Sequence, residues 1–443
     1  MQKQTNFGTE SIRKLLIQQS IPAALGILVL SIYSIVDTIF IGQYIGGIGI
    51  AAITIVSPIT FLVSSIGLGI GMGGGSLISI KLGKDDVNSA KNIFGNQSLM
   101  ILFFSILFIG GGFLFANSIL SGFGAHGEIL TASHEYFFFT LLGLPFFMGQ
   151  MMLNNVLRAE GKARLAMFVL ILPSVLNIVL DAIFITQLDM GLNGAALATA
   201  ISQLSGVLIG VILILRSSQI TPSLVNFKFS GKLIRSISSL GSVQFFSQAS
   251  MSIVVIIANN LLMKYGGDVA ISAYGLDLRI MMFAFFPVIG IVQGFMPVAG
   301  YNFGAGNIER VKEAIKQSFI SSTIIGILIM VTMLLFLDPI LRIFTSELEL
   351  IELAKVALFY FVVGFPLLGI QQVSTSYFQA IGKAKPALWL TLAKQFILIP
   401  TMFILPLWYG LEGIWYTIPI TEIATTILVL FFFVKDVRSI TEN

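Results

Sequence analysis

The sequence has 443 residues, of which 56% are hydrophobic, only 10% are charged and none is cysteine. A soluble domain carries about 25% charged residues, so this composition excludes an ordinary water-soluble fold and indicates that lipid is the natural solvent. The lack of cysteine excludes disulfides, thiolate metal sites and cysteine nucleophiles. The net charge of +4 does not indicate nucleic-acid binding, and we expect no nucleic-acid partner.

Apolar stretches of roughly 20 residues, the length that crosses a bilayer, follow one another along the whole chain. The short polar N-terminus, Met1–Glu10, lacks the pattern of a cleaved signal peptide, so the first helix is expected to be retained. We predict an all-α integral membrane protein with twelve transmembrane helices, at residues 14–41, 48–80, 92–120, 131–157, 165–187, 191–215, 236–264, 268–301, 313–338, 351–380, 386–408 and 411–434.

The Lys and Arg residues of the connecting segments alternate between two sides. Only Lys264, Arg342 and Lys355 fall on one side, and the other loop residues of this kind fall on the opposite side. Basic loops stay in the cytoplasm, so both termini are predicted to be cytoplasmic. An omitted or invented helix would break this alternation, which supports the count of twelve.

A long polar stretch near the middle of the chain is the predicted linker between two halves. It divides the sequence into an N-lobe at 1–216, a cytoplasmic linker at 217–232 and a C-lobe at 233–443. The sequence repeats across it, because Gly161-Lys162-Ala163 recurs as Gly382-Lys383-Ala384. Each half has an even number of helices, so both enter from the same side. The pattern therefore predicts two pseudo-symmetric six-helix lobes in a parallel repeat, with substrate handled between them.

Glycines recur through the second predicted helix, from Gly67 to Gly75. They superficially resemble a dinucleotide-binding fingerprint, but no strand precedes them and the segment is apolar. Small residues along a membrane helix usually permit close packing or bending. We therefore interpret this segment as a packing surface.

Ionisable residues inside spans are costly and each needs a reason. In the first half, Asp37 and Asp181 are predicted at similar depths near the outer end of their helices, with Asn177 one turn before Asp181. Thr199 reaches a similar depth and Tyr33 shares a face with Asp37. Two carboxylates with an amide and a hydroxyl could bind a proton or a small hard cation. The alternative is that each Asp only hydrogen-bonds a neighbouring helix.

The second half contains four further intramembrane charges: Asp277, Arg279, Lys394 and Glu422. Asp277 and Arg279 are two residues apart and so point to different sides of their helix. We favour internal neutralisation, in which Asp277 or Glu422 pairs with Lys394 and stabilises this half. Direct contact with substrate is the alternative.

The chain resembles the multidrug and toxic compound extrusion (MATE) family, and more narrowly its DinF-type bacterial branch. The resemblance runs nearly end to end and rests on several motifs together, which are Tyr33-Ser-Ile-Val-Asp37-Thr-Ile-Phe-Ile-Gly42, Leu157-Arg-Ala-Glu-Gly-Lys162, Asn177-Ile-Val-Leu-Asp181, Gly191-Leu-Asn-Gly194, Ala273-Tyr-Gly-Leu-Asp-Leu-Arg279 and Tyr301-Asn-Phe-Gly304. It implies two six-helix lobes, alternating access, and export of amphipathic, mostly cationic drugs by a monomer in the bacterial inner membrane. It implies no cofactor, and inward flow of protons or sodium as the driving force.

By the same resemblance, the cation site of the N-lobe falls on Asp37, Asn177, Asp181 and Thr199, where sodium is the alternative to a proton. The drug pocket falls on Tyr33, Gln150, Asn154 and Ser174. One branch of the family has a carboxylate on the seventh helix, but residues 241–262 contain none here. This departure concentrates the expected coupling in the N-lobe.

Two other functions compete with drug export. A flippase for lipid-linked sugars often lines its cavity with several cationic residues, whereas only Arg279 and Lys394 are available here, both in one half. A membrane-embedded enzyme would need a nucleophile and a base inside the membrane, and the sequence has neither cysteine nor an intramembrane histidine. Both are therefore disfavoured against a secondary transporter.

Overall fold

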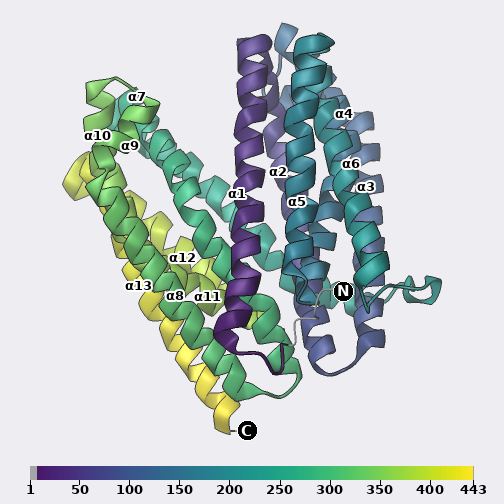
Figure 1. Ribbon diagram of the computed structural model, residues 1–443. Coiled ribbons are helices and arrows are strands. Elements are labelled where there is room, and N and C mark those ends of the chain that lie inside the picture. The colour runs from purple at the N-terminus through teal and green to yellow at the C-terminus, as the bar shows by residue number, and fades with distance from the viewer. Residues whose placement is uncertain (1–6, 443) are drawn as a thin grey trace. The chain divides into compact units, whose positions relative to one another are not determined.

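The computed structural model describes residues 7–442, and within them side chains up to Val437. Helices dominate this part of the chain (Figure 1). Their bounds are α1 Ile12–Tyr44, α2 Gly47–Gly83, α3 Val87–Gly122, α4 Gly127–Ala159, α5 Ala163–Asp181, the π-helix η1 Ala182–Gln187, α6 Gly191–Ser217, the 3-10 helix η2 Leu224–Asn226, α7 Gly231–Gly304, α8 Ile308–Leu335, α9 Leu337–Phe344, α10 Leu348–Val363, α11 Phe365–Ala380, α12 Ala384–Ile404 and α13 Pro406–Glu442.

The predicted twelve spans are present in this set. Ten helices are long and apolar enough to cross a membrane, and α10 with α11 forms one further span that is bent by 46°. The remaining span lies within α7, whose 74 residues are interrupted at Gly267. An uninterrupted helix of that length would measure about 110 Å, against about 30 Å for the hydrocarbon core. The chain is therefore a multi-pass membrane protein.

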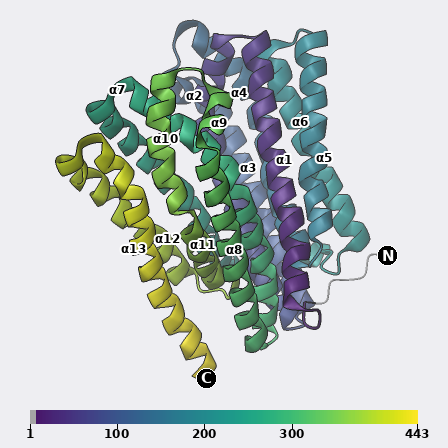
Figure 2. The same cartoon turned by 60° about the vertical axis from the view of Figure 1, so that its left-hand side comes forward.

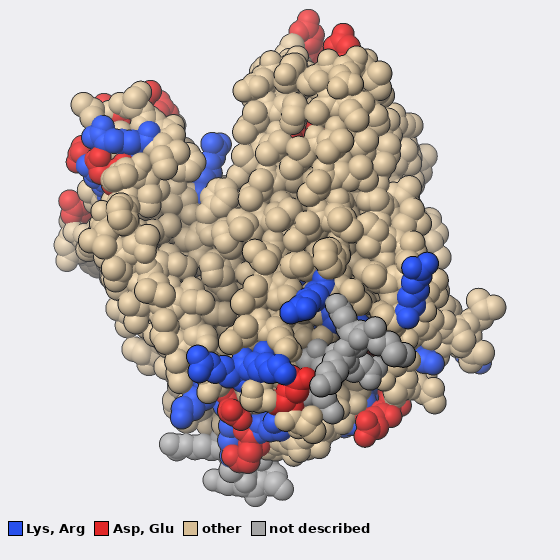
Figure 3. Space-filling view, in the orientation of Figure 1, with Lys and Arg blue, Asp and Glu red and all other residues tan. Residues whose placement is uncertain are grey.

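The surface agrees with this conclusion. Many large apolar side chains are exposed along the helices, including Phe61, Ile106 and Phe431, each more than 60% exposed. Figure 3 shows long uncharged stretches of surface, with most charged side chains gathered near helix ends. Lipid is the solvent that such a surface requires.

The breaks in the helices repeat along the chain. A positive φ at Gly46, Asp85 and Gly161 recurs at Gly267, Gly306 and Gly382, in each case 221 residues later. The non-helical Phe115 inside α3 has its counterpart in Phe336, which separates α8 from α9. Left-handed backbone favours glycine, and Asp tolerates it better than most residues do. The repeat predicted from a few identities therefore extends to the backbone conformation.

The chain forms two compact units that do not follow the predicted lobe boundaries. The first unit contains Leu25–Phe245, and the second contains Phe7–Ala24 with the residues from Phe246 onward. The beginning of α1 thus packs with the second half, and the beginning of α7, residues 231–245, packs with the first. Each half thus contributes the beginning of its first helix to the other unit. The two boundaries are equivalent in the repeat, since residues 24 and 245 are again 221 positions apart. Figure 2 shows that the helices within each unit run side by side.

Glycine makes these exchanged contacts possible. In the first unit, a methyl group on Gly69 would lie 2.8 Å from the backbone oxygen of Gly241 in α7. In the second unit, a methyl group on Gly290 would lie 3.0 Å from the backbone oxygen of Ser20 in α1. The predicted packing role of the glycines in α2 is therefore confirmed at Gly69.

The helix expected at 165–187 is confirmed as one span, Ala163–Gln187, in which the α-helix α5 continues as the π-helix η1. The break expected between the helices at 386–408 and 411–434 is present at Gly410, whose φ of 54° interrupts α13. Only the limit at 408 was wrong, because α12 already ends at Ile404 and Pro406 begins α13. Proline is tolerated at the start of a helix but removes an N–H from its interior, so the boundary lies at the proline. The predicted orientation of the termini concerns residues outside the described part of the chain.

Candidate functional site

Five of the residues predicted to bind cation or drug line one cavity in the first unit. The cavity has a volume of about 10 Å³, room for little more than one water molecule, and is bounded by α1, α4, α5 and α6. Its predicted members are Tyr33, Gln150, Ser174, Asn177 and Thr199, and its other lining residues are Leu30, Phe147, Pro173, Ser202 and Gln203. Drug-sized pockets usually measure about 300–1,000 Å³, so this one is small.

Helix α5 presents its polar residues on one face. Ser174, Asn177 and Asp181 are spaced three and four residues apart, so they lie one above another. All three side chains are buried. The Nδ2 group of Asn177 donates a hydrogen bond of 3.2 Å to Oγ1 of Thr199 and so joins α5 to α6.

The two carboxyl groups of the first unit are neighbours. Asp37 lies close enough to Asp181 for their charges to affect each other; Asp181 is fully buried, whereas Asp37 is partly exposed. Oδ1 of Asp37, both carboxyl oxygens of Asp181 and Oδ1 of Asn177 receive no hydrogen bond from the described residues. Buried acceptors without donors are costly. Four acceptor oxygens in one place would be satisfied by a proton or by a small cation.

The amides of α4 have a structural task in this conformation. Pro173 has no N–H, so the carbonyl of Val169, four residues earlier, lacks its usual helix partner. Nε2 of Gln150 donates a hydrogen bond of 2.7 Å to that carbonyl. Asn154 is similar, because its Nδ2 donates to Ala166 O at 2.6 Å. Unlike the other predicted drug-pocket residues, Asn154 does not line the cavity.

Two further cavity residues were missed from the sequence. Ser202 and Gln203 line the cavity three and four residues after Thr199 on α6. Helical spacing places them on the same face as Thr199. That periodicity would have identified them, had it been applied to polar neutral residues as well as to charged ones.

The second unit contains an ion pair at the predicted charges. Nζ of Lys394 lies 2.6 Å from Oε1 of Glu422, and Nε2 of Gln371 donates to Oε2 at 2.8 Å. Glu422 is therefore the partner of Lys394. Asp277 is fully buried, and neither of its carboxyl oxygens has a hydrogen-bond partner among the described residues. Arg279 is exposed, so it does point away from the face of Asp277.

No group of three or more His, Asp or Glu residues in the described part of the chain is arranged to hold a metal ion. The first-unit site therefore has two carboxylates at most, with neutral oxygens beside them.

The fold and this site define a class of protein. Two six-helix repeats in a membrane, with buried carboxyl groups beside an intramembrane cavity, are typical of a secondary transporter. The MatE family model matches residues 22–183 and again 243–404. These two matches begin at equivalent positions of the repeat and together cover well over half of the chain. The chain belongs to the MatE family and is a transporter, not an enzyme.

Relatives and solved structures agree. The multidrug export protein MepA of Staphylococcus aureus is 27% identical over 440 residues, which are 97% of this chain and 96% of that protein. MepA of Staphylococcus haemolyticus is 29% identical over 428 residues, covering 96% and 94% of the two chains. A crystal structure of MATE in complex with MaL6 has a TM-score of 0.94 and 25% identity over the full length of both chains. A MOP superfamily transporter from Pyrococcus furiosus has a TM-score of 0.93 and 25% identity, again over both full lengths.

Proposed function

We propose that this protein is a multidrug efflux transporter that exports amphipathic, mostly cationic compounds in exchange for an inward-moving proton, with sodium as the alternative ion. The names of the MepA relatives support drug export. The neighbouring carboxyl groups of Asp37, which is partly exposed, and of Asp181, which is buried, carry the proposal for exchange. Both groups lie in the first unit, each one helical turn from a residue that lines the cavity, Tyr33 or Asn177, although neither lines the cavity that we propose receives the drug.

Exchange requires that the cation and the drug alter each other's affinity by the same factor. Two adjacent carboxylates away from water do not both ionise cheaply. In the proposed cycle, one proton shared between Asp37 and Asp181 leaves the pair with a single negative charge, and loss of that proton leaves two negative charges, which attract a cationic drug. Moving one charge across the membrane releases about 2.3 kcal/mol per 100 mV, so one proton per cycle supplies useful driving force.

The cavity must widen for this cycle to operate. Its volume of about 10 Å³ is far below the usual range for a drug-sized ligand. Gln150 lines the cavity, and its amide donates a hydrogen bond of 2.7 Å to the carbonyl of Val169. Separation of α4 from α5 at this bond would free the Gln150 amide to contact substrate, as the family resemblance implies.

The test uses purified protein in vesicles with an imposed pH or sodium gradient and a fluorescent organic cation. Asp37→Asn is expected to fold and to bind the cation, but to reduce gradient-driven export more than tenfold. Asp181→Asn should be nearly as damaging. Asp189→Asn is the matched control, because Asp189 is exposed and has a positive φ that Asn also tolerates. Full export by Asp37→Asn at normal expression would remove the pair from the mechanism.

The same vesicles identify the ion. Export that follows a pH gradient at equal sodium supports the proton, and export that follows a sodium gradient at equal pH supports sodium. Export that depends on neither gradient contradicts the proposed exchange of drug for a proton or sodium.

A further inference from the structure

The segment between the two halves, residues 218–230, exposes apolar side chains to an unusual degree. Leu224 is 91% exposed, Phe229 78% and Val225 65%. This segment, here called the linker, follows α6, and in Figure 1 it projects from the first unit. Contiguous exposed apolar residues usually mark an interaction site or a membrane contact.

The middle of the linker is held in a defined conformation. Ser223 and Asn226 form a capping box around the 3-10 helix η2, so Leu224 and Val225 lie on an ordered turn. Nδ2 of Asn226 donates to Oδ1 of Asn92 at 2.8 Å, and Nδ2 of Asn96 donates to the carbonyl of Lys228 at 3.1 Å. Both asparagines belong to α3. Hydrogen bonds to α3 therefore hold the apolar tip of the linker, Leu224 and Val225, in its exposed position.

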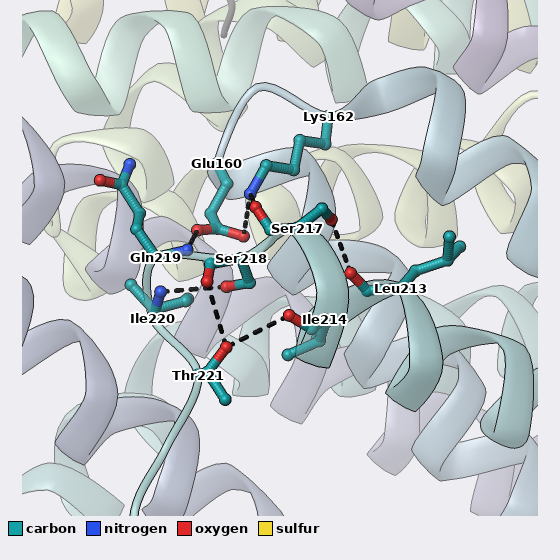
Figure 4. A network of polar contacts seen from close by, with 9 residues as sticks. All are labelled: Glu160, Lys162, Leu213, Ile214, Ser217, Ser218, Gln219, Ile220 and Thr221. Atoms are coloured by element: carbon teal, nitrogen blue, oxygen red, sulfur yellow. Dashed lines mark hydrogen bonds and ion pairs between the residues drawn. The ribbon is translucent and has the colours of Figure 1, made fainter. Parts of the chain in front are cut away.

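The start of the linker is held by a polar network (Figure 4). Nζ of Lys162 contacts Oε2 of Glu160 at 3.0 Å and the carbonyl of Ser217 at 2.6 Å. Oε1 of Glu160 accepts a hydrogen bond of 3.0 Å from the backbone N–H of Gln219. Because both oxygens of Glu160 are engaged and its side chain is buried, this acid does not offset the exposed positive charges that follow.

Those charges have one sign. The sequence has no Asp or Glu between Asp189 and Asp268. Within that stretch, Lys228, Lys232 and Arg235 are exposed in or just after the linker. Basic residues next to exposed apolar side chains are the combination that binds membranes with anionic headgroups.

A large apolar groove begins at the linker. It is an open groove of about 910 Å³ between α3 and α6, with α4 as its floor. Pro222 and Phe227 of the linker line one end. Along α3 the groove runs from Phe94 to Ile109, which is about 22 Å at 1.5 Å per residue. Only two of its lining side chains, Ser98 and Ser105, carry hydroxyl groups; the rest are apolar.

We propose that the linker and this groove form a binding site for an anionic phospholipid. An acyl chain lies in the groove, the phosphate is held by Lys228, Lys232 and Arg235, and Leu224 and Phe229 insert at the headgroup level. The walls of the groove are residues of membrane spans, so a membrane lipid reaches them directly. A peripheral protein would meet the tip but not the groove, which is why a lipid is the occupant that fits.

The first experiment measures insertion of the tip. Since the chain has no cysteine, Leu224→Cys can be labelled alone with a polarity-sensitive fluorophore and the protein placed in nanodiscs. Quenching by lipids with a spin label near the headgroup is expected for this variant. Lys84→Cys, in the exposed α2–α3 turn, is the control and should be quenched little. Equal, weak quenching at both positions overturns the proposal and leaves the tip as a docking surface for another protein.

The second experiment measures lipid affinity by native mass spectrometry, with phosphatidylglycerol and phosphatidylcholine of identical chains as probes. The triple variant Lys228→Gln, Lys232→Gln, Arg235→Gln should lose about fivefold in affinity for phosphatidylglycerol per residue, and little for phosphatidylcholine. Lys84→Gln is the charge control.

A second variant tests the groove without changing charge. Val211→Trp fills the groove from its exposed rim and should weaken binding of both lipids. Equal affinity for the two lipids in the unmodified protein, or unchanged affinity in both the triple variant and Val211→Trp, overturns the proposal.

Discussion

The ion pair between Lys394 and Glu422 allows a quantitative test of how the second unit tolerates charge. Glu422 is nearly buried, with 8% of its side chain exposed, and Lys394 is 27% exposed. We consider the single variants Lys394→Met and Glu422→Gln and the double variant that carries both. Each single change leaves one charge inside a span without its opposite, whereas the double change leaves none.

The expected magnitudes follow from this burial. Removing one partner of a buried pair costs about 3–5 kcal/mol, because the other charge remains desolvated and unpaired. Lys394→Met leaves the more buried group, Glu422, with a charge that only the amide of Gln371 still contacts among the described side chains. A loss of about 3 kcal/mol is therefore expected. Glu422→Gln leaves the partly exposed Lys394 and should cost about 2 kcal/mol. The double variant should lose only about 1 kcal/mol, since a neutral replacement of a buried pair is often tolerated.

The assay is the free energy of unfolding from an SDS titration in one detergent, with export measured in parallel. Lys312→Gln is the control, because Glu309, the partner of Lys312 at 2.6 Å, is 84% exposed and such pairs contribute about 0–1 kcal/mol. If the double variant is as unstable as the worse single variant, internal neutralisation is wrong. If it is stable but fails to export, Lys394 or Glu422 contacts the substrate or the coupling ion instead.

Two further predictions concern packing and pH. Gly69→Ala places a methyl group against the backbone of Gly241 and should lower the free energy of unfolding by about 1–3 kcal/mol in the same titration. The control is Gly110→Ala, which has open space around it and should be neutral or slightly stabilising. Equal effects of the two variants would contradict the close approach of Gly69 to Gly241. Hydrogen bonds, that of Arg342 foremost, lower the pKa of Asp338 to about 2, so its contribution to stability should stay constant above about pH 4 and disappear as the pH falls toward 2. Arg342→Gln should raise this pKa toward its usual value. At low pH the unfolding midpoint of Arg342→Gln should therefore differ less from that of Asp338→Asn than the midpoint of the unmodified protein does. Export should be unchanged.

The sequence was sufficient for the spans and the repeat, because both depend on local properties. An apolar stretch identifies a span wherever it lies, and a residue in left-handed backbone, such as Gly161, recurs with its loop at Gly382. The family model matches twice, starting at residues 22 and 243, which is the same shift of 221. The carboxyl pair was predictable for a similar reason, since charge inside a span is rare and therefore conspicuous.

What the sequence could not supply were contacts between distant residues. Nothing in residues 7–24 indicates that they pack with the second half, because their apolar pattern suits either unit. The hydrogen bond from Gln150 to Val169 depends on a carbonyl freed by Pro173, which requires knowing that α4 lies beside α5. The choice of Glu422 over Asp277 as the partner of Lys394 likewise depended on how three helices pack.

The exchange of the first helices bears on how coupling could reach the second unit. Helix α1 is continuous from Ile12 to Tyr44, yet it belongs to the second unit up to Ala24 and to the first unit from Leu25. Nδ2 of Asn302 donates to the carbonyl of Phe7 at 3.1 Å, so the chain before α1 is fixed within the second unit.

The carboxyl group of Asp37 lies near the other end of the same helix, in the first unit. A change in charge at Asp37 therefore acts on a helix whose far end is held by the other unit. Pro22 lies two residues before the boundary and removes one backbone hydrogen bond there, so bending is easiest at that point. Covalent continuity of α1 is then sufficient to link the proposed coupling site to the second unit, without any contact between their polar sites.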